Sequence, residues 1–161
     1  MRVVSDTTTL IAFLGLGRMS VLKELFGKLA IPKAMYEELH QKAVPALEEW
    51  AEVIEIKDRR SYRSYRKVLG AGESEALCLC AQIGADAILL DDRRARLVAR
   101  RLSLTPMGTL GVLLVAKKRG LIAAVRPEIE RLEQEVRFRI APGLREEVLR
   151  TAGELPEGAE P

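Results

Sequence analysis

The chain has 161 residues, the size of one domain, and 48% of them are hydrophobic, which excludes a chain that is disordered throughout. It contains one histidine, His40, and two cysteines, Cys78 and Cys80, so catalytic histidine pairs, multi-histidine zinc sites and a disulfide framework are excluded. The formal net charge is +3 and 18 of the 26 basic residues are arginine, which makes a phosphate-bearing partner reasonable.

Short apolar runs that stop at polar residues alternate with segments of helical periodicity. In chain order, the sequence predicts a strand at 3–5, helices at 10–16 and 20–29, a short strand at 30–31, helices at 32–39 and 46–51, a strand at 53–56, helices at 59–69 and 73–83, a strand at 87–90, a helix at 93–102, a strand at 103–107, helices at 108–120 and 121–132, a strand or loop at 138–140 and a helix at 143–151. This alternation predicts an α/β fold in which right-handed βαβ crossovers surround a mostly parallel sheet.

The expected domain organisation is simple. Residues 1–141 are predicted to form a single domain, followed by a C-terminal helix at 142–152. Residues 153–161 hold two prolines and three glutamates and are predicted to be a disordered tail. The acidic residues gather at this end: residues 142–161 hold two arginines against five glutamates, so residues 1–141 carry a net charge of +6.

Several carboxylates stand where polar groups are unexpected, namely at the ends of apolar strands or on helix faces that should be buried. They are Asp6, Glu38, Glu73, Glu75, Asp91 and Asp92. In open α/β sheets, ligands bind beyond the carboxyl ends of the strands, and Asp6 and Asp91-Asp92 follow two such ends. Carboxylates that converge there repel one another unless a divalent cation neutralises them, and Mg²⁺ and Mn²⁺ prefer oxygen ligands.

Each of these acids also has a purely structural explanation. Asp6 and the pair Asp91-Asp92 precede predicted helices and can cap them. Glu73 and Glu75 lie in a first helical turn, where the helix dipole favours negative charge. The residue spacing by itself leaves the metal site and the helix caps open as alternatives.

The ordered set of these segments resembles a PIN-domain nuclease. The segments are Val4-Ser5-Asp6-Thr7, Pro32 with Glu38 six residues later, Gly72-Glu73-Ser74-Glu75-Ala76, Leu89-Leu90-Asp91-Asp92 and Gly108-Thr109-Leu110-Gly111. The resemblance covers about residues 1–125 and is nearest to the prokaryotic branch related to VapC-type toxins of toxin–antitoxin pairs. It implies a three-layer α/β/α sandwich, a bound Mg²⁺ or Mn²⁺, and hydrolysis of single-stranded RNA.

The resemblance also implies roles for individual residues. Asp6 matches the first acid of the family and Glu38 the second, while Thr7 matches a hydroxyl residue near the metal. The third acid falls on Glu75 or Glu73, with Glu75 the better match by its offset to the following apolar run, and the fourth falls on Asp91 or Asp92. A glutamate at the third position departs from the aspartate of many VapC-type toxins, which bears on activity rather than on the fold.

Two basic segments are candidates for RNA contact. They contain Arg59, Arg60, Tyr62, Arg63, Tyr65 and Arg66 in one helix, and Arg94 and Arg96 in another. Arginines interleaved with tyrosines suit phosphate contacts combined with base stacking. The alternatives are a solvated helix face, contact with an acidic partner such as an antitoxin tail, or neutralisation of the acidic cluster by Arg94 or Arg96.

The function expected from these observations is a Mg²⁺- or Mn²⁺-dependent ribonuclease of the PIN type, held inactive by an antitoxin protein. The competing interpretations are a catalytically silent PIN-like module that binds RNA or a partner, and another Mg²⁺-dependent phosphoryl-transfer enzyme. A homodimer is expected, formed through apolar surface of the helices at 10–29 and 32–51. The longest apolar run is far below the ~20 residues of a membrane helix, and the cysteine usage suits a reducing cytoplasm.

Overall fold

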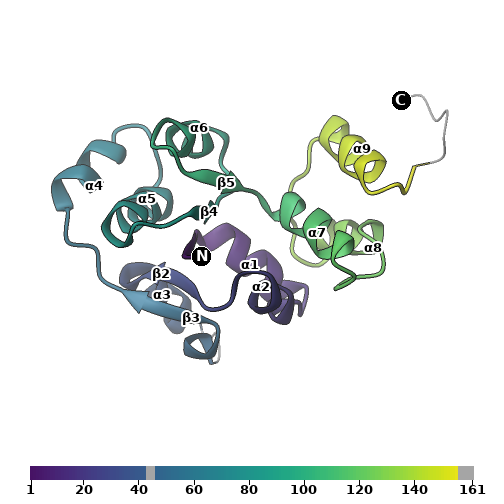
Figure 1. Ribbon diagram of the computed structural model, residues 1–161, viewed down its shortest axis with the longest axis horizontal. Helices are drawn as coiled ribbons and strands as arrows, with labels where there is room; N and C mark the ends of the chain where they lie inside the picture. The colour runs from purple at the N-terminus through teal and green to yellow at the C-terminus, as the bar shows by residue number, and fades with distance from the viewer. Residues whose placement is uncertain (43–45, 156–161) are drawn as a thin grey trace.

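The computed structural model describes residues 1–42 and 46–155. Its elements, in chain order, are β1 (Val3–Ser5), α1 (Thr7–Gly15), α2 (Met19–Phe26), β2 (Leu29–Pro32), α3 (Lys33–Gln41), the 3-10 turn η1 (Leu47–Glu49), β3 (Ala51–Ile54), α4 (Arg59–Tyr65), α5 (Ala71–Ile83), β4 (Ala87–Leu89), α6 (Arg93–Arg101), β5 (Thr105–Met107), α7 (Thr109–Lys118), α8 (Arg126–Gln134) and α9 (Pro142–Thr151) (Figure 1).

The five strands form one parallel sheet in the order β3-β2-β1-β4-β5. The chain first places β2 and β3 on one side of β1 and then crosses to place β4 and β5 on the other side. The order therefore reverses between β1 and β4. In sheets of this kind the crevice beyond the carboxyl ends at the reversal is the usual ligand site.

Backbone hydrogen bonds continue past the strand ends at this reversal. The Asp6 N–H donates to the Leu89 carbonyl at 2.9 Å, and the Leu90 N–H donates to the Met107 carbonyl at 2.9 Å. The residues that follow β1 and β4 are therefore held beside the ends of β4 and β5. The sheet thus fixes the backbone of Asp6 beside that of β4. Asp91 stands two residues after the end of β4.

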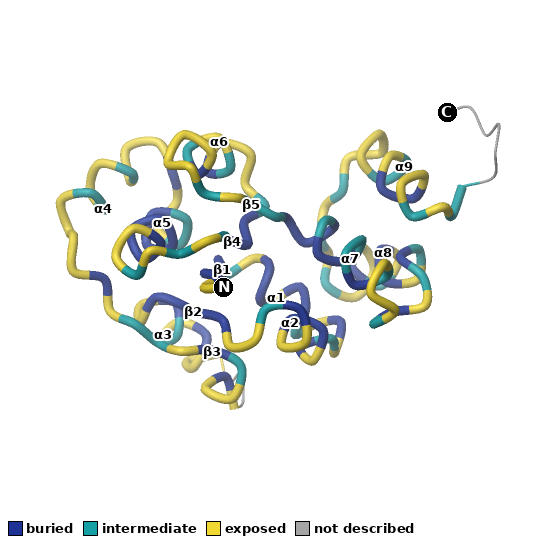
Figure 2. The backbone as a smooth tube through the Cα atoms, viewed as in Figure 1, coloured by how far each residue is buried: buried dark blue, intermediate teal, exposed yellow. Residues whose placement is uncertain are grey.

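Helices cover both faces of the sheet, because alternate residues of each strand point to opposite sides. Val3 and Leu89 join a core with α1, α2, α3 and α7 to α9, whereas Val4, Ile88 and Leu90 join a core with α5 and α6. Figure 2 shows the backbone buried along β1, β2 and much of α5, with α4 and α6 mostly exposed. The expected three-layer α/β/α sandwich is confirmed, with every strand parallel.

Some predicted elements are wrong in extent. The segment 20–29 stops being helical at Phe26, because Gly27 takes a positive φ of 69° and Leu29 begins β2. The helix predicted at 46–51 is a single 3-10 turn, since Ala51 already pairs with Leu29 as the first residue of β3. The helix predicted at 121–132 begins only at 126, after a turn at Gly120, and 138–140 is a loop.

Two helices show how composition determines depth in the fold. The sequence predicts a helix apolar on almost all sides at α5, and residues 74–80 of this helix are all buried. Helix α6 carries five arginines, and of its residues only Ala95 and Ala99 are buried.

Among the residues that the structure describes, no helix is long and apolar enough to cross a membrane.

The C-terminal helix packs into the same core as the sheet. Val148 and Leu149 of α9 belong to the core that includes α7 and α8. After α9, the Glu154 carboxylate accepts hydrogen bonds from the N–H groups of Val125 at 2.7 Å and Arg126 at 2.9 Å, and from Lys117 at 3.1 Å. These bonds tie residue 154 to the start of α8; residues 156–161 of the predicted tail lie outside the described part of the chain.

We expect Glu154→Ala to lower the free energy of unfolding by about 1–3 kcal/mol, because buried donors at the start of α8 lose their acceptor. Partial burial works to raise the pKa of Glu154, but the N–H groups of Arg126 and Val125 and the Lys117 ammonium outweigh it and hold the pKa below its usual value. The ionised side chain therefore stabilises the fold above the unfolded pKa of about 4.3. This contribution is lost as the pH falls through the lower folded pKa.

Thermal melts at pH 7 and pH 3 test this expectation, with Glu130→Ala as the matched control, because Glu130 is an exposed glutamate on α8 itself. Glu154→Ala should melt clearly below wild type at pH 7, and the difference between the two proteins should be smaller at pH 3. Identical melts of the two variants at pH 7 would show that the Glu154 contacts contribute nothing to stability.

Candidate functional site

Asp6 is the most deeply placed acid at the carboxyl edge of the sheet. It follows β1 directly, is 2% exposed, and caps α1 by accepting a hydrogen bond from the Thr9 N–H at 2.9 Å. Burial raises the pKa of Asp6 to about 7, with smaller contributions from the negative charges of Asp91 and Glu73, against a lowering by the Thr9 hydrogen bond. The capping interpretation of Asp6 is correct, and it coexists with an environment that disfavours the charged carboxylate.

Asp91 comes from the neighbouring strand end and is held by three donors. Its Oδ1 accepts the Thr109 N–H at 2.8 Å, and its Oδ2 accepts the hydroxyls of Thr109 at 2.7 Å and Thr9 at 3.1 Å. Thr9 thus binds Asp6 through its N–H and Asp91 through its hydroxyl. Both threonines are fully buried, so the Asp91 carboxylate has a fixed orientation.

Sequence reasoning missed both of these threonines. Thr9 stands three residues after Asp6, which is the spacing at which a capping side chain meets a backbone N–H, so the cap itself was foreseeable. The contact of its hydroxyl with Asp91 depends on the pairing of β1 with β4, which no local pattern shows. Thr109 begins α7 directly after Gly108, and only the fold brings it to Asp91.

Gly108 makes room for this arrangement. A Cβ atom at this position would lie 2.9 Å from Asp91 Oδ1 and 3.1 Å from an Arg96 guanidinium nitrogen. Arg96 and Asp91 therefore both approach the same stretch of backbone. A methyl group at residue 108 would displace the carboxylate that Thr9 and Thr109 hold in place.

We expect Gly108→Ala to weaken Mn²⁺ binding at the acidic edge by tenfold or more, because it displaces Asp91. Gly111→Ala is the matched control: its Cβ would meet only the flexible Met107 side chain, at 3.2 Å, and alanine favours a helix interior over glycine. Calorimetric titration of both variants with Mn²⁺ measures the difference. Equal affinities in the two variants would mean that Asp91 does not contribute to a metal site.

The other predicted acids lie in different places. Asp92 is exposed and caps α6, accepting the Ala95 N–H at 2.8 Å. Glu73 lies near enough to Asp6 to raise the pKa of that carboxyl, and it lines one hollow together with Asp91 and Asp92. The structure therefore brings Asp6, Asp91 and Glu73 to one edge, with Asp92 turned to its own helix.

The predicted placement of Glu38 is wrong, whereas Glu75 is buried as predicted but forms an ion pair. The sequence predicts Glu38 on the apolar side of its helix, but its side chain is 56% exposed and pairs with Lys42 at 2.8 Å, because Met35 and Leu39 occupy the inward face of α3. Glu75 is buried, but it pairs with Arg59 at 3.1 Å. The offset within the Glu-Ser-Glu segment favours Glu75, whereas the turn of α5 places Glu73 nearer to Asp6.

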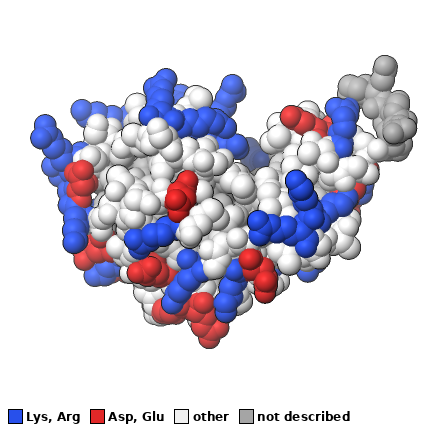
Figure 3. All heavy atoms as spheres, in the orientation of Figure 1, with Lys and Arg blue, Asp and Glu red and all other residues white. Residues whose placement is uncertain are grey.

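The remaining candidates divide between contacts within the fold and exposed surface. The Thr7 hydroxyl lies 3.4 Å from where a Cβ at Gly72 would be, so it faces the start of α5. Tyr62 and Tyr65 are half-buried against the α5 core, and Arg66 donates to the Leu69 carbonyl at 2.8 Å. Arg60, Arg63 and Arg94 are exposed, and so are Arg59 and Arg66. Figure 3 shows the lysine and arginine side chains gathered over α4 and α6.

The donors at the acidic edge suit a hard divalent cation. They are carboxylate oxygens with threonine hydroxyls beside them, the ligand chemistry of Mg²⁺ and Mn²⁺. Across residues 1–42 and 46–155, no group of three or more His, Cys, Asp or Glu side chains lies close enough to hold a metal ion. Mg²⁺ is often held by one or two carboxylates and several waters, so Asp6 and Asp91, with Glu73 nearby, fit it in donor type.

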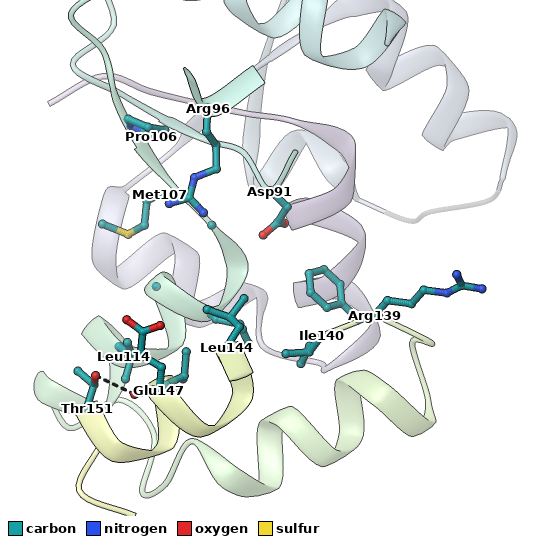
Figure 4. A pocket seen from close by; sticks show the side chains of 15 residues that line it. Asp91, Arg96, Pro106, Met107, Leu114, Arg139, Ile140, Leu144, Glu147 and Thr151 are labelled. Atoms are coloured by element: carbon teal, nitrogen blue, oxygen red, sulfur yellow. Dashed lines mark hydrogen bonds between the residues drawn. The ribbon is translucent and has the colours of Figure 1, made fainter. Parts of the chain in front are cut away.

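Two hollows open beside Asp91. The first, which we call the α9 hollow, has a volume of about 390 Å³ and lies between β5, α6 and α9. Figure 4 shows Asp91 and Arg96 on one side of this hollow and Leu144 and Glu147 of α9 on the other. The second, here the α5 hollow, has a volume of about 500 Å³ and is lined by Thr8, Glu73, Asp92 and Arg137 among others. Asp91, Phe138 and Arg139 border both hollows.

Comparisons with known proteins agree with this geometry. A family model described as PIN domain matches residues 2–154, which includes α9 and Glu154. No curated protein and no solved structure gave a match. The match covers nearly the whole chain, and PIN domains are generally nucleases that use divalent metals. The match to the family model, together with the parallel sheet and the acids at its reversal, shows that the chain belongs to the PIN-domain family.

Proposed function

We propose that this protein is a Mg²⁺- or Mn²⁺-dependent ribonuclease that hydrolyses phosphodiester bonds of single-stranded RNA. The observation that carries the proposal is the placement of Asp6 and Asp91 at the β1–β4 reversal, both bound to Thr9. A pair of carboxylates kept close together, one of them with a pKa of about 7, is a natural receptor for a divalent cation. Membership of the PIN-domain family supports a nuclease in general.

The chain's own residues prepare this site. Thr9 and Thr109 fix the Asp91 oxygens, and Asp6 is fixed by the N–H at the start of α1. Arg96 lines the α9 hollow beside Asp91 and offers guanidinium donors to the phosphate oxygens of a bound strand. A divalent cation held by Asp6 and Asp91 would supply charge neutralisation at the phosphate and an acidified water.

The cellular role we propose is that of a toxin restrained by an antitoxin protein in the cytoplasm. Net charge and surface pattern support an acidic or RNA partner, since Arg60, Arg63 and Arg94 are exposed over α4 and α6. A homodimer is also part of the proposal. The apolar surface that α1 and α2 offer to a second copy is smaller than the sequence predicted, because these helices bury most of their apolar residues in the core. Ile11 of α1 is 37% exposed.

The test combines binding and cleavage. Wild type and Asp6→Asn are melted with and without Mn²⁺, and both are incubated with single-stranded RNA in Mg²⁺, Mn²⁺ or EDTA. We expect Mn²⁺ to raise the wild-type melting temperature and to support cleavage, and Asp6→Asn to lose both effects, since metal that binds only the folded state stabilises it. Equal Mn²⁺ stabilisation of both proteins, or undiminished cleavage by Asp6→Asn, would contradict the proposed site.

One observation favours a second candidate, a PIN-like module that binds RNA or a partner without cleaving. Glu38 and Glu75, the second and third acids implied by the family resemblance, are engaged in ion pairs with Lys42 and Arg59. RNA binding without cleavage in any metal would select this alternative. Loss of both the Mn²⁺ stabilisation and the RNA cleavage of wild type in Glu75→Gln would indicate that Glu75 leaves Arg59 for the metal, and would select the nuclease.

A further inference from the structure

The C-terminal loop between α8 and α9 forms part of the wall of both hollows beside Asp91. The loop spans residues 135–141 and includes Arg137-Phe138-Arg139, of which Phe138 and Arg139 border the α9 hollow and the α5 hollow alike. Phe138 is fixed at its backbone, where its N–H donates to the Leu132 carbonyl at 2.8 Å. An aromatic side chain is therefore held at the meeting point of two cavities, next to the carboxylate of the candidate metal site.

Phe138 differs from the other phenylalanines in its surroundings. Phe13 is fully buried in the core, whereas Phe26 of α2 and Phe138 are both half-buried against that core, and of these two only Phe138 borders the hollows beside Asp91. Phe138 is half-buried and has an exposed arginine on each side along the chain. The left-handed backbone of Arg137, with a φ of 57°, turns the chain at the end of α8 and brings residue 137 to the α5 hollow.

The chemistry of these walls fits a nucleotide strand. Bases of single-stranded RNA stack on aromatic side chains, while arginines bind the phosphates between them. Apolar side chains, among them Met107, Ile140 and Leu144, line one part of the α9 hollow, and charged side chains, among them Arg96 beside Asp91, line the rest. Figure 4 shows Glu147 across this hollow from Asp91 and Arg96, where a carboxylate can accept a hydrogen bond from a base amino group.

We propose that Phe138 stacks on a nucleobase next to the scissile phosphate, and that the α9 hollow and the α5 hollow receive the nucleosides on the two sides of it. Arg139 binds a phosphate of the same strand. This inference rests on the proposed function, because it assigns the scissile phosphate to Asp91. It makes the C-terminal loop, outside the sheet, a positioning element for the RNA.

The experiment measures binding and cleavage separately. Binding of a fluorescein-labelled single-stranded RNA is followed by anisotropy in EDTA, where no metal is present, and KM and kcat are measured in Mn²⁺. Phe138→Leu keeps an apolar side chain but removes the flat ring, and should weaken RNA binding and raise KM about tenfold. Phe138→Tyr should restore both to within about twofold of wild type. Mn²⁺ stabilisation of the fold should be the same in all of these proteins.

Matched controls separate stacking from packing and from charge. Phe26→Leu makes the same change at a half-buried phenylalanine on α2 and should leave RNA binding unchanged. Arg139→Gln should flatten the dependence of log affinity on log salt concentration by about 0.7, the value for one phosphate contact on a single strand, while Arg119→Gln at the exposed end of α7 should not.

The outcomes distinguish this inference from the proposed function. Cleavage with a wild-type KM in Phe138→Leu overturns the inference and leaves the nuclease standing. Phe138-dependent RNA binding without cleavage in any metal overturns the nuclease and leaves the binding site standing. Equal, Phe138-dependent binding of a poly-glutamate peptide overturns the stacking role, because that peptide carries charge and no bases.

Discussion

Asp91→Asn is expected to reduce Mn²⁺-dependent RNA cleavage by at least a hundredfold, whereas Asp92→Asn should stay within about twofold of wild type. The two residues are adjacent, but Asp91 faces Thr9 and Thr109 while Asp92 caps α6. Asparagine removes the charge at residue 91 and with it a ligand for a divalent cation. At residue 92 asparagine is as good a cap as aspartate, so α6 should be unaffected.

The fold of both variants should be intact. At residue 91 the carbonyl oxygen of the substituted side chain would still accept the Thr109 N–H, and the threonine hydroxyls can rotate to accept from the new amide. Circular dichroism and thermal melting in EDTA check this before activity is compared. Loss of cleavage in Asp92→Asn with full activity in Asp91→Asn would assign the metal to the exposed residue and contradict the structure-based choice.

Much of the architecture could be predicted from the sequence because its signals are local. The run 87–90 is wholly apolar and α5 is apolar on most sides, so a buried parallel strand and a buried helix follow directly. The predicted helix boundaries were wrong where a positive φ, and not the pattern of apolar side chains, determines the end of the helix. Gly27 ends α2 through a positive φ, and Ala46 takes a φ of 53° before η1, which converts an expected helix into a turn leading to β3.

The candidate site could be predicted only in part, because it depends on which strands are neighbours. Asp6 and Asp91 are identifiable as polar residues at the ends of apolar strands. Their shared contact with Thr9 follows from the pairing of β1 with β4, strands that lie more than 80 positions apart in the chain, so no local pattern shows it.

The sequence leaves two choices open, between Asp91 and Asp92 and between Glu73 and Glu75, and these choices require the directions of the side chains. Asp91 and Asp92 cannot be told apart by composition, yet one turns to Thr109 and the other to the N–H of Ala95. Glu73 and Glu75 differ by two positions on a helix, which directs them to different sides; Glu75 meets Arg59. The C-terminal loop with Phe138 lies beyond residues 1–125, where the motifs recognised in the sequence stand, so only the fold links it to Asp91.

The other large expected effect is a pH-dependent gain in stability on removing the Asp6 charge. The folded pKa of about 7 lies above the unfolded value of about 3.9. Well below pH 4, Asp6 is protonated in the folded and in the unfolded state, so it does not lower the free energy of unfolding. Between pH 4 and pH 7 the unfolded chain has lost the proton while the folded chain keeps it, so stability falls as the pH rises. Above pH 7 the full cost of a buried carboxylate is present.

Asp6→Asn cannot titrate, and its side-chain oxygen can still cap α1 through the Thr9 N–H. In EDTA we therefore expect it to melt only slightly above wild type at pH 4.5 and several degrees above it at pH 8, at about 2–4 °C for each kcal/mol of relieved cost. Mn²⁺ must displace the proton from Asp6, so its stabilisation of wild type should grow from pH 5.5 to pH 8 and be absent in Asp6→Asn. Melts of both proteins at these pH values, with Mn²⁺ or EDTA, decide the matter. A difference between them that is constant with pH in EDTA would mean that Asp6 is ionised throughout and that burial does not hold its proton.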